Sequence, residues 1–345
     1  MKQEPFIIGE TAVQPGQRKI IDLPMPKLYT HTVMNLTAHV INGRRPGPRL
    51  FVSAAVHGDE INGVEIIRRL LKRKVLNTLR GTLIAIPIVN SFGLIHQSRY
   101  LPDRRDLNRM FPGSSSGSLA GRLADIFMTG IVSHCTHGID LHTGSNHRFN
   151  LPHIRASFTD EETRNLAEAF GAPVMVDAKT RDGSLRQAVA EKGVPVLLYE
   201  AGEALRFDEF SIRTGVRGIV SVMQSIGMLS SKAKRAKKTV LHTSTSKWVR
   251  APISGIVSQR VSIGVQVSKG ERIGIVSDPH NEVEQEVLAP VSGVILGRLE
   301  LPLVYQGDAL FHIAVFEEDL EAGKLIEELA SELSQDDYRP SDSMI

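Results

Sequence analysis

The sequence is poor in several residue types, and each shortage excludes a class of protein. A single cysteine, Cys135, allows neither an intramolecular disulfide nor a CxxC site. Only 5% of the residues are aromatic and Trp248 is the sole tryptophan, so a stacking platform for single-stranded nucleic acid is not expected. With 41 basic and 38 acidic residues, the net charge of +3 over 345 residues is too small to indicate a nucleic acid or an anionic membrane surface as a partner.

Long apolar runs are also missing. No stretch approaches the roughly 18 consecutive apolar residues of a membrane span. The first ten residues, MKQEPFIIGE, lack the basic region and the apolar core of a signal peptide. One cysteine suits a reducing compartment. We therefore expect a cytoplasmic protein with no membrane partner, and a homo-oligomer is compatible with the sequence.

The apolar residues that are present are numerous and regularly placed. They make up 41% of a chain that is longer than one compact domain usually needs, so two domains are expected. Apolar runs such as Leu50–Val56 alternate with segments of helical spacing, which predicts an α/β domain with a mostly parallel mixed sheet flanked by helices. The predicted strands are 34–41, 50–56, 82–89, 138–144, 172–177 and 195–202, with helices in 57–74, 119–132 and 161–170, a turn at 42–48 and a polar loop at 99–113.

The character of the sequence changes after residue 228. The basic run SKAKRAKK at 231–238 is more typical of a solvated linker than of a nucleic-acid patch, and helical spacing is lost beyond it. We expect a catalytic domain at 1–230, a basic linker at 231–244, a β-rich domain at 245–318 and a C-terminal helix or tail at 319–345.

The β-rich part contains an internal repeat. The segment APISGIV at 251–257 recurs as APVSGVI at 289–295. The two copies resemble the halves of a biotinyl/lipoyl β-sandwich, in which a lysine between the halves carries the cofactor. No lysine lies between residues 274 and 295, so we expect a structural or lid domain rather than a carrier. Tyr305, in the second half, is the residue of this part best able to offer a hydroxyl to a substrate.

Two short segments hold residues typical of a zinc site. His57 and Glu60 lie three apart where a predicted strand meets a helix, a spacing that can put both side chains on one side of the first turn. Alternatively, Asp59 and Glu60 only favour the helix N-terminus. In DLHTG, His142 ends a strand with Asp140 on the same side, where the carboxylate can orient the imidazole, unless a backbone carbonyl satisfies it. Together the segments supply the two histidines and one carboxylate of a hydrolytic zinc site.

Other segments offer further polar groups. Asn108 and Arg109, in DLNRMFPG, form a fork suited to a carboxylate, although arginine-rich loops are usually solvated. Glu200, at the end of a predicted strand, is a candidate general base if it faces a cavity and a solvated glutamate otherwise. His134 and His137, in HCTH, look metal-like, but we interpret them as helix-end residues.

The four segments occur in the order found in the succinylglutamate desuccinylase/aspartoacylase family of the zinc carboxypeptidase-like superfamily. The chain resembles that family over about residues 45–230, with an HxxE, a DLNR segment, a DxH and a late glutamate. The resemblance implies one zinc ion per chain on His57, Glu60 and His142, and a substrate carboxylate held by Asn108 and Arg109.

The resemblance also assigns the remaining roles. Glu200 would activate the attacking water, and an arginine before the DLNR segment would polarise the scissile carbonyl. Arg99 is the candidate, but its spacing to the DLNR segment is longer than in aspartoacylases, so Arg104 and Arg105 stay as alternatives. The segment 146–155, which follows the metal histidine, is expected to line the pocket, with Arg148 in contact with the substrate.

The implied activity is hydrolysis of the amide bond in a small N-acyl amino acid or a related N-acyl compound. A metallocarboxypeptidase that removes a C-terminal residue from a short peptide is the alternative, because a carboxylate fork suits both substrates. A metal-free binding protein built on the same fold is a third interpretation. The intact set of His57, Glu60, His142 and Glu200 argues against it.

Overall fold

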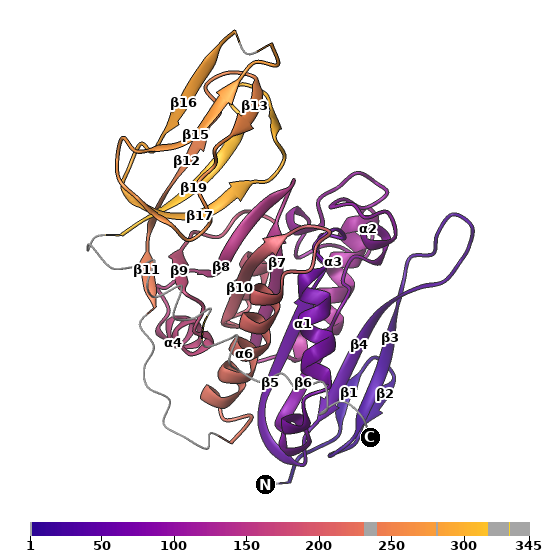
Figure 1. Ribbon diagram of the computed structural model, residues 1–345. Coiled ribbons are helices and arrows are strands. Elements are labelled where there is room, and N and C mark those ends of the chain that lie inside the picture. The colour runs from indigo at the N-terminus through magenta and orange to yellow at the C-terminus, as the bar shows by residue number, and fades with distance from the viewer. Residues whose placement is uncertain (1, 231–239, 281, 317–330, 332–345) are drawn as a thin grey trace.

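One long mixed sheet runs through the computed structural model, which describes residues 2–230, 240–280, 282–316 and 331 (Figure 1). Within these residues the sheet has 13 strands. Ten of them follow one another in the spatial order β12 (Thr245–Arg250), β19 (Ala309–Val315), β17 (Gly293–Leu299), β8 (Arg148–Ala156), β10 (Val196–Glu203), β7 (His137–Gly144), β5 (Arg45–Ala54), β6 (Arg80–Ile86), β4 (Met34–Asn42) and β3 (Arg18–Met25).

The middle of the sheet is parallel and its flanks are antiparallel. β10, β7, β5 and β6 run parallel to one another, whereas β8 runs against β10 and β4 runs against β6. The parallel strands are buried along most of their length, as their continuous apolar runs predict. The predicted mixed sheet flanked by helices is therefore confirmed.

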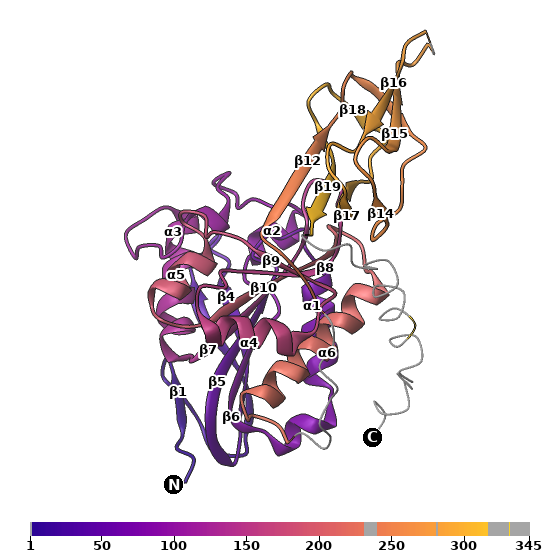
Figure 2. The same cartoon turned by 90° about the vertical axis from the view of Figure 1, so that its left-hand side faces the viewer.

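Helices cover both faces of the sheet and create two separate cores. Helices α1 (Asn62–Leu71), α4 (Glu161–Phe170) and α6 (Glu209–Ser225) pack on one face, where their apolar side chains join those of β5, β7 and β10. Helices α3 (Leu119–Gly130) and α5 (Leu185–Glu191) pack on the other face. Figure 2 shows α3 and α5 to the left of the strands and α6 to the right.

Some predicted boundaries need correction. The predicted turn at 42–48 is wrong in part, because β5 already begins at Arg45, which pairs with Arg80. A register shift between Arg45 and Arg49 accommodates the two prolines within this strand. The segment that became β8 was not predicted as a strand, and neither α5 nor α6 was predicted as a helix.

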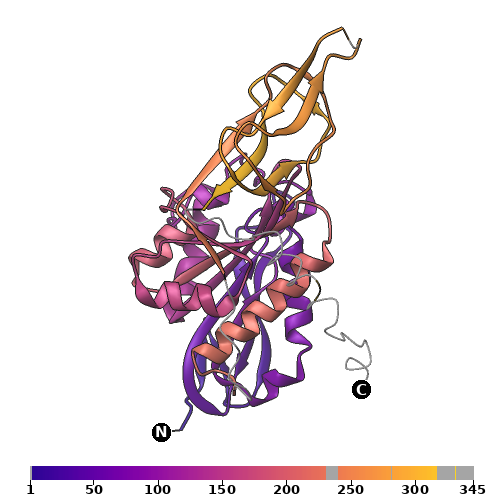
Figure 3. The same ribbon diagram turned by 60° about the vertical axis from the view of Figure 1, so that its left-hand side comes forward.

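The β-rich part is attached to the main sheet by backbone pairing. A four-stranded sheet of β16 (Glu284–Leu288), β15 (Arg272–Ser277), β13 (Gly255–Ser258) and β18 (Leu303–Val304) packs on β12, β17 and β19 around a core of its own. β17 also pairs with β8, which joins the two parts (Figure 3). The first copy of the repeat leads into β13 and the second into β17, so the copies lie in different sheets.

Several short elements complete the fold. The segment after β6 forms α2 (Ser91–Ile95), and the DLNR segment forms a single 3-10 turn at Leu107–Arg109. β9 (Val174–Asp177) pairs with β8 and with β11 (Leu241–Thr243), while β14 (Gln266–Val267) pairs with β17, and β1 (Phe6–Ile8) pairs with β2 (Thr11–Val13). Two more 3-10 turns lie at Lys74–Thr78 and Val132–His134.

Two expectations fall on residues whose placement is not described. The predicted linker at 231–244 and the predicted C-terminal segment at 319–345 lie largely outside the described ranges. Among the residues that the structure does describe, no helix has the length and apolar character that crossing a membrane requires.

Candidate active site

A polar cavity of about 300 Å³ lies at the carboxyl ends of the parallel strands, where α/β sheets usually bind ligands. Strands β7, β8 and β10 form its floor, the loop after β6 closes one side, and residues of β12 and β19 close the other. His57, Glu60, His142 and Glu200 all line it.

The strand-to-helix turn that carries the HxxE segment is tightly packed. β5 ends at Ala54, and Ala55 has a positive φ of 51°, which turns the chain away from the sheet. A Cβ on Gly58 would lie 1.9 Å from the carbonyl carbon of Gly93 in α2, so only glycine fits there. This turn delivers His57 and Glu60 to the same side.

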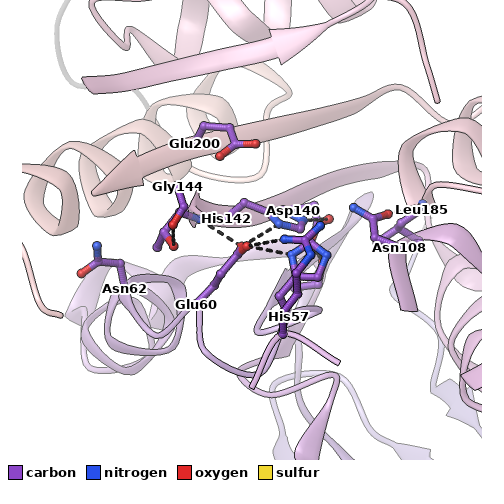
Figure 4. A network of polar contacts seen from close by, with 12 residues as sticks. His57, Glu60, Asn62, Asn108, Asp140, His142, Gly144, Leu185 and Glu200 are labelled. Carbon is purple, nitrogen blue, oxygen red and sulfur yellow. Dashed lines mark hydrogen bonds and ion pairs between the residues drawn. The ribbon is translucent and has the colours of Figure 1, made fainter. Parts of the chain in front are cut away.

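Two imidazoles and one carboxylate converge in the cavity (Figure 4). The Nδ1 atom of His57 lies 2.8 Å from one carboxylate oxygen of Glu60, and the Nδ1 atom of His142 lies 2.8 Å from the other. The three side chains are buried, and they form a group that could hold a metal ion. The structure therefore brings all three predicted metal ligands together.

Each imidazole has a second carboxylate on its far nitrogen. The Nε2 atom of His142 lies 2.7 Å from Asp140, whose other oxygen accepts a hydrogen bond from Ser53. The Nε2 atom of His57 lies 3.1 Å from Asp106. Carboxylates in these positions fix the ring orientation and leave Nδ1 free to bind a metal, as in many metal sites. Sequence spacing predicted the role of Asp140 but not that of Asp106.

The electrostatics of this cluster favour a divalent cation. Glu60, Asp106 and Asp140 bring three negative charges, while Arg99 brings one positive charge. Burial opposes the charged form of His142, but Asp140 and Glu60 outweigh it and raise its pKa. A site that draws protons onto buried imidazoles offers the same negative potential to a metal ion. The donor set of two nitrogens and a carboxylate fits zinc.

Arg99 is the arginine that the structure brings to the cluster. Its guanidinium donates hydrogen bonds to Asp106 at 2.9 Å and to Glu60 at 3.3 Å. The two alternatives, Arg104 and Arg105, are exposed and do not line the cavity.

Asn108 lies across the cavity from Glu200 (Figure 4), and both Asn108 and Arg109 line the cavity. The amide oxygen of Asn108 accepts a hydrogen bond of 2.8 Å from the backbone N–H of Leu185, which leaves its NH₂ group available. Arg109 donates a hydrogen bond to the backbone carbonyl of Asn108. The two residues expected to form a carboxylate fork therefore both line the cavity.

Glu200 lies on β10 and points into the cavity (Figure 4). Asn150 donates a 3.1 Å hydrogen bond to its carboxylate. Burial is the main cause that raises the pKa of Glu200, the Glu60 charge adds to it, and His142 opposes it. Glu203, three residues further along the chain, instead contacts His147 and Arg206 and does not line the cavity.

The β-rich part contributes different residues from the one expected. Tyr305 is 79% exposed and lies outside the cavity, so the structure does not support a substrate contact there. Trp248, Arg250 and His312 line the cavity instead. Arg148 also lines it, as expected, with its guanidinium 5.8 Å from the centroid of the Trp248 ring.

The histidines interpreted as helix-end residues are remote from the cluster. His134 ends the 3-10 turn Val132–His134, as expected, but the interpretation is wrong for His137, which begins β7, the strand that carries His142 near its other end. His137 contacts Glu162 at 3.0 Å, and neither His134 nor His137 lines the cavity.

The segment 146–155 was expected to line the pocket, and His153 and Arg155 line it from β8, although the sequence assigned them no individual roles. Their spacing of two would have placed both on one face had a strand been predicted there. Sequence reasoning missed Arg181 and Arg186, which line the cavity from the loop before α5 and from α5 itself. No spacing signal links these two arginines to the other motifs.

The first conclusion concerns the class of site: two imidazoles and one carboxylate that could hold a metal ion lie at the carboxyl ends of the strands of an α/β sheet. Residues 46–226 match the family model described as the succinylglutamate desuccinylase/aspartoacylase catalytic domain. The chain belongs to this family.

Individual relatives extend the similarity over most of the chain. The N-alpha-acetyl-L-2,4-diaminobutyric acid deacetylase of Halomonas elongata is 26% identical over 294 residues, which cover 80% of this chain and 85% of that protein. A succinylglutamate desuccinylase/aspartoacylase from Rhodobacter sphaeroides has a TM-score of 0.78 at 25% identity, covering 88% of this chain and 96% of that one. A product-bound ectoine utilization protein from Ruegeria pomeroyi shares the fold, with a TM-score of 0.77 at 23% identity and 87% and 95% coverage.

Proposed function

We propose that the protein is a zinc-dependent deacylase that hydrolyses the amide bond of small N-acyl amino acids. The observation that carries this proposal is the convergence of His57, Glu60 and His142 beside Glu200 in one cavity. The similarity to a deacetylase of an N-acetylated amino acid supports amide hydrolysis over other reactions.

The chain's own residues would hold and orient the metal. The Nδ1 atoms of His57 and His142 and the carboxylate of Glu60 are the proposed ligands. Zinc bound there would supply Lewis acidity, which lowers the pKa of water to about 7 and polarises a carbonyl group. Asp106 and Asp140 would keep both rings in the orientation that presents Nδ1.

Glu200 is the proposed general base. Its carboxylate would take a proton from the attacking water as the oxygen bonds to the acyl carbon, and would return that proton to the leaving nitrogen as the C–N bond breaks. Asn150 orients the carboxylate for both transfers. Arg99 would stabilise the negative charge that develops on the carbonyl oxygen.

The charge of the cavity favours anionic substrates. Only Glu60 and Glu200 among its described lining residues are acidic, against a set of arginines. Arg186 is 9% exposed, and one of its terminal nitrogens has no hydrogen-bond partner among the described residues. We infer that the substrate carries a second carboxylate in addition to the one held by Asn108 and Arg109. The arginines concerned are Arg99, Arg109, Arg148, Arg155, Arg181, Arg186 and Arg250.

The same arginines argue against a cationic side chain on the substrate. The ammonium group of a diaminobutyric acid derivative would lie among like charges in a half-enclosed cavity. N-acyl derivatives of acidic amino acids are therefore the proposed substrates, and a short peptide with a C-terminal carboxylate, cleaved by a carboxypeptidase, is the alternative.

Release of the free amino acid from a panel of substrates tests the proposal. The panel comprises N-acetyl and N-succinyl derivatives of aspartate and glutamate, N-acetyl-2,4-diaminobutyrate, and dipeptides with a free N-terminus. We expect zinc-loaded protein to hydrolyse the acidic N-acyl compounds with the highest kcat/KM. Faster cleavage of the dipeptides would support the carboxypeptidase alternative, and no hydrolysis by protein with stoichiometric zinc would overturn the proposal.

We also propose the division into a catalytic domain at 1–230 and a β-rich domain at 245–318 of the biotinyl/lipoyl type. The β-rich part has its own core, and the two repeat copies lead into strands of different sheets, which supports this division. Its role would be to complete the cavity with Trp248, Arg250 and His312.

A further inference from the structure

One buried imidazole in the cavity has no role in the mechanism above. His153 on β8 is 1% exposed, lines the cavity, and has an Nε2 atom with no hydrogen-bond partner among the described residues. A buried polar atom without a partner costs free energy, and such atoms in a binding cavity are positions where a ligand can supply the missing partner.

The sheet register places His153 beside the proposed base. Glu200 is the register partner of His142 on β7 and of His153 on β8, so these three residues form one row across three neighbouring strands, with strands about 4.8 Å apart. The adjacent residues on the three strands, Leu141, Tyr199 and Ile154, belong to the core under α1, α4 and α6. Because side chains alternate along a strand, the whole row faces the cavity.

The hydrogen bond on the other side of the ring defines what His153 can bind. Its Nδ1 atom lies 2.7 Å from the backbone carbonyl oxygen of Leu151. A carbonyl can only accept, so Nδ1 carries the proton. Burial, with the charge of Arg155 adding to it, lowers the pKa of His153 to about 3, so the ring is neutral. Nε2 therefore presents a lone pair, which accepts a hydrogen bond.

The charges around His153 restrict which group can donate a hydrogen bond to its Nε2 atom. Arg155 and Arg186 line the same part of the cavity, which disfavours a cationic donor such as an ammonium group. The neutral donor that every N-acyl amino acid possesses is the N–H of its amide bond. That bond must also lie next to Glu200, which exchanges a proton with the same nitrogen.

We propose that His153 is a specificity-determining residue whose Nε2 accepts the N–H of the scissile amide and so selects amides over the corresponding esters. This inference rests on the proposed deacylase function. The hydrogen bond would keep the nitrogen oriented so that its lone pair faces Glu200 when the C–N bond breaks. An ester has an oxygen at this position, which offers no proton to His153.

The test compares kcat/KM for an amide substrate with kcat/KM for its oxygen analogue, the O-acyl 2-hydroxy acid with the same acyl group and carboxylates. The variant His153→Phe keeps a ring but removes the acceptor. His312→Phe is the matched control, because His312 is also a buried histidine of the cavity but lies outside the row. A ratio of two rates on one preparation is independent of the fraction of protein that is folded.

We expect His153→Phe to lower the amide-to-ester ratio about tenfold, the effect of losing one hydrogen bond, and His312→Phe to leave the ratio unchanged. If the phenylalanine variant does not fold, His153→Leu allows the same comparison of the amide-to-ester ratio. An unchanged ratio in both His153 variants would overturn the proposal, whatever the effect on overall rate. Failure of the wild-type protein to hydrolyse any N-acyl amino acid would instead contradict the deacylase function itself.

Discussion

Glu200 on β10 and His142 on β7 are register partners on neighbouring parallel strands. The proposed base and a proposed metal ligand therefore share one row of the sheet, and the backbone hydrogen bonds of two buried strands fix their separation. Catalytic groups held by a rigid sheet keep their geometry without help from a mobile loop. Because the strands and not the Glu200 side chain hold His142 in place, a substitution of Glu200 should affect catalysis and not metal binding.

Glu200→Gln removes the basic carboxylate and keeps the size of the side chain and an acceptor for Asn150. We expect kcat to fall at least about 100-fold, the lower end for general acid–base catalysis, with metal content unchanged. Steady-state kinetics and metal analysis on the same preparation check this. Near-wild-type turnover would exclude Glu200 as the base.

Arg109→Ala removes the charged half of the carboxylate fork. Because charge-assisted hydrogen bonds to a carboxylate contribute about 1.5–3 kcal/mol, we expect KM to rise roughly tenfold or more while kcat changes less. Arg104→Ala is the matched control, since Arg104 is exposed in the same loop and does not line the cavity. An equal effect of both changes on KM would indicate a general charge effect rather than a fork.

Trp248→Ala tests whether the β-rich part completes the substrate cavity. Trp248 stacks on His312 with ring centroids 4.3 Å apart and lies next to Arg148. Its loss would loosen this wall, so we expect a severalfold higher KM for the best N-acyl substrate. Tyr305→Ala, an exposed aromatic of the same part, should leave both kinetic constants unchanged. Wild-type kinetics in Trp248→Ala would contradict the proposed role of this part.

In the metal-free protein, the contribution of His312 to stability should be lost as the pH is lowered below about 6.5. Burial, with Arg155 adding to it, lowers the pKa of His312 to about 4. The unfolded chain therefore binds a proton on His312 between pH 6.5 and 4 that the folded chain does not bind, and stability present above pH 6.5 is lost on acidification. This one group would account for about 3 kcal/mol over the whole range.

Urea denaturation at pH 7 and pH 4.5 measures this dependence. His312→Phe keeps the stacking on Trp248 and removes the titration, so its free energy of unfolding should vary less with pH than that of the wild type. Identical pH dependence in the two proteins would show that His312 does not carry the effect.

The sequence was informative where function depends on short segments at strand ends. His57 and Glu60 share one turn, and Asp140 and His142 share one strand, so local spacing was enough to predict that each pair lies together. The predicted sheet then placed both pairs at the same edge. The pairing of Asp106 with His57 was not predictable, because 49 residues separate them and a loop conformation brings them together.

The residues that complete the cavity were harder to predict for the same reason. Trp248 and His312 reach the site because β17 pairs with β8. This pairing joins two segments that are far apart in the chain through three pairs of residues, so no local sequence pattern reveals it. Tyr305 was expected in the cavity because it carries a hydroxyl. The structure places it in an exposed turn, where its backbone N–H donates to Asp308.

The metal content of the purified protein tests the zinc site most directly. We predict about one zinc per chain in the wild type, activity that a chelator abolishes and zinc restores, and loss of both metal and activity in His57→Ala and His142→Ala with the fold retained by circular dichroism. His134→Ala, remote from the cluster, should keep metal and activity. Activity that persists in metal-free wild-type protein, or zinc retained at full stoichiometry in both cluster variants, would contradict a catalytic metal on His57, Glu60 and His142.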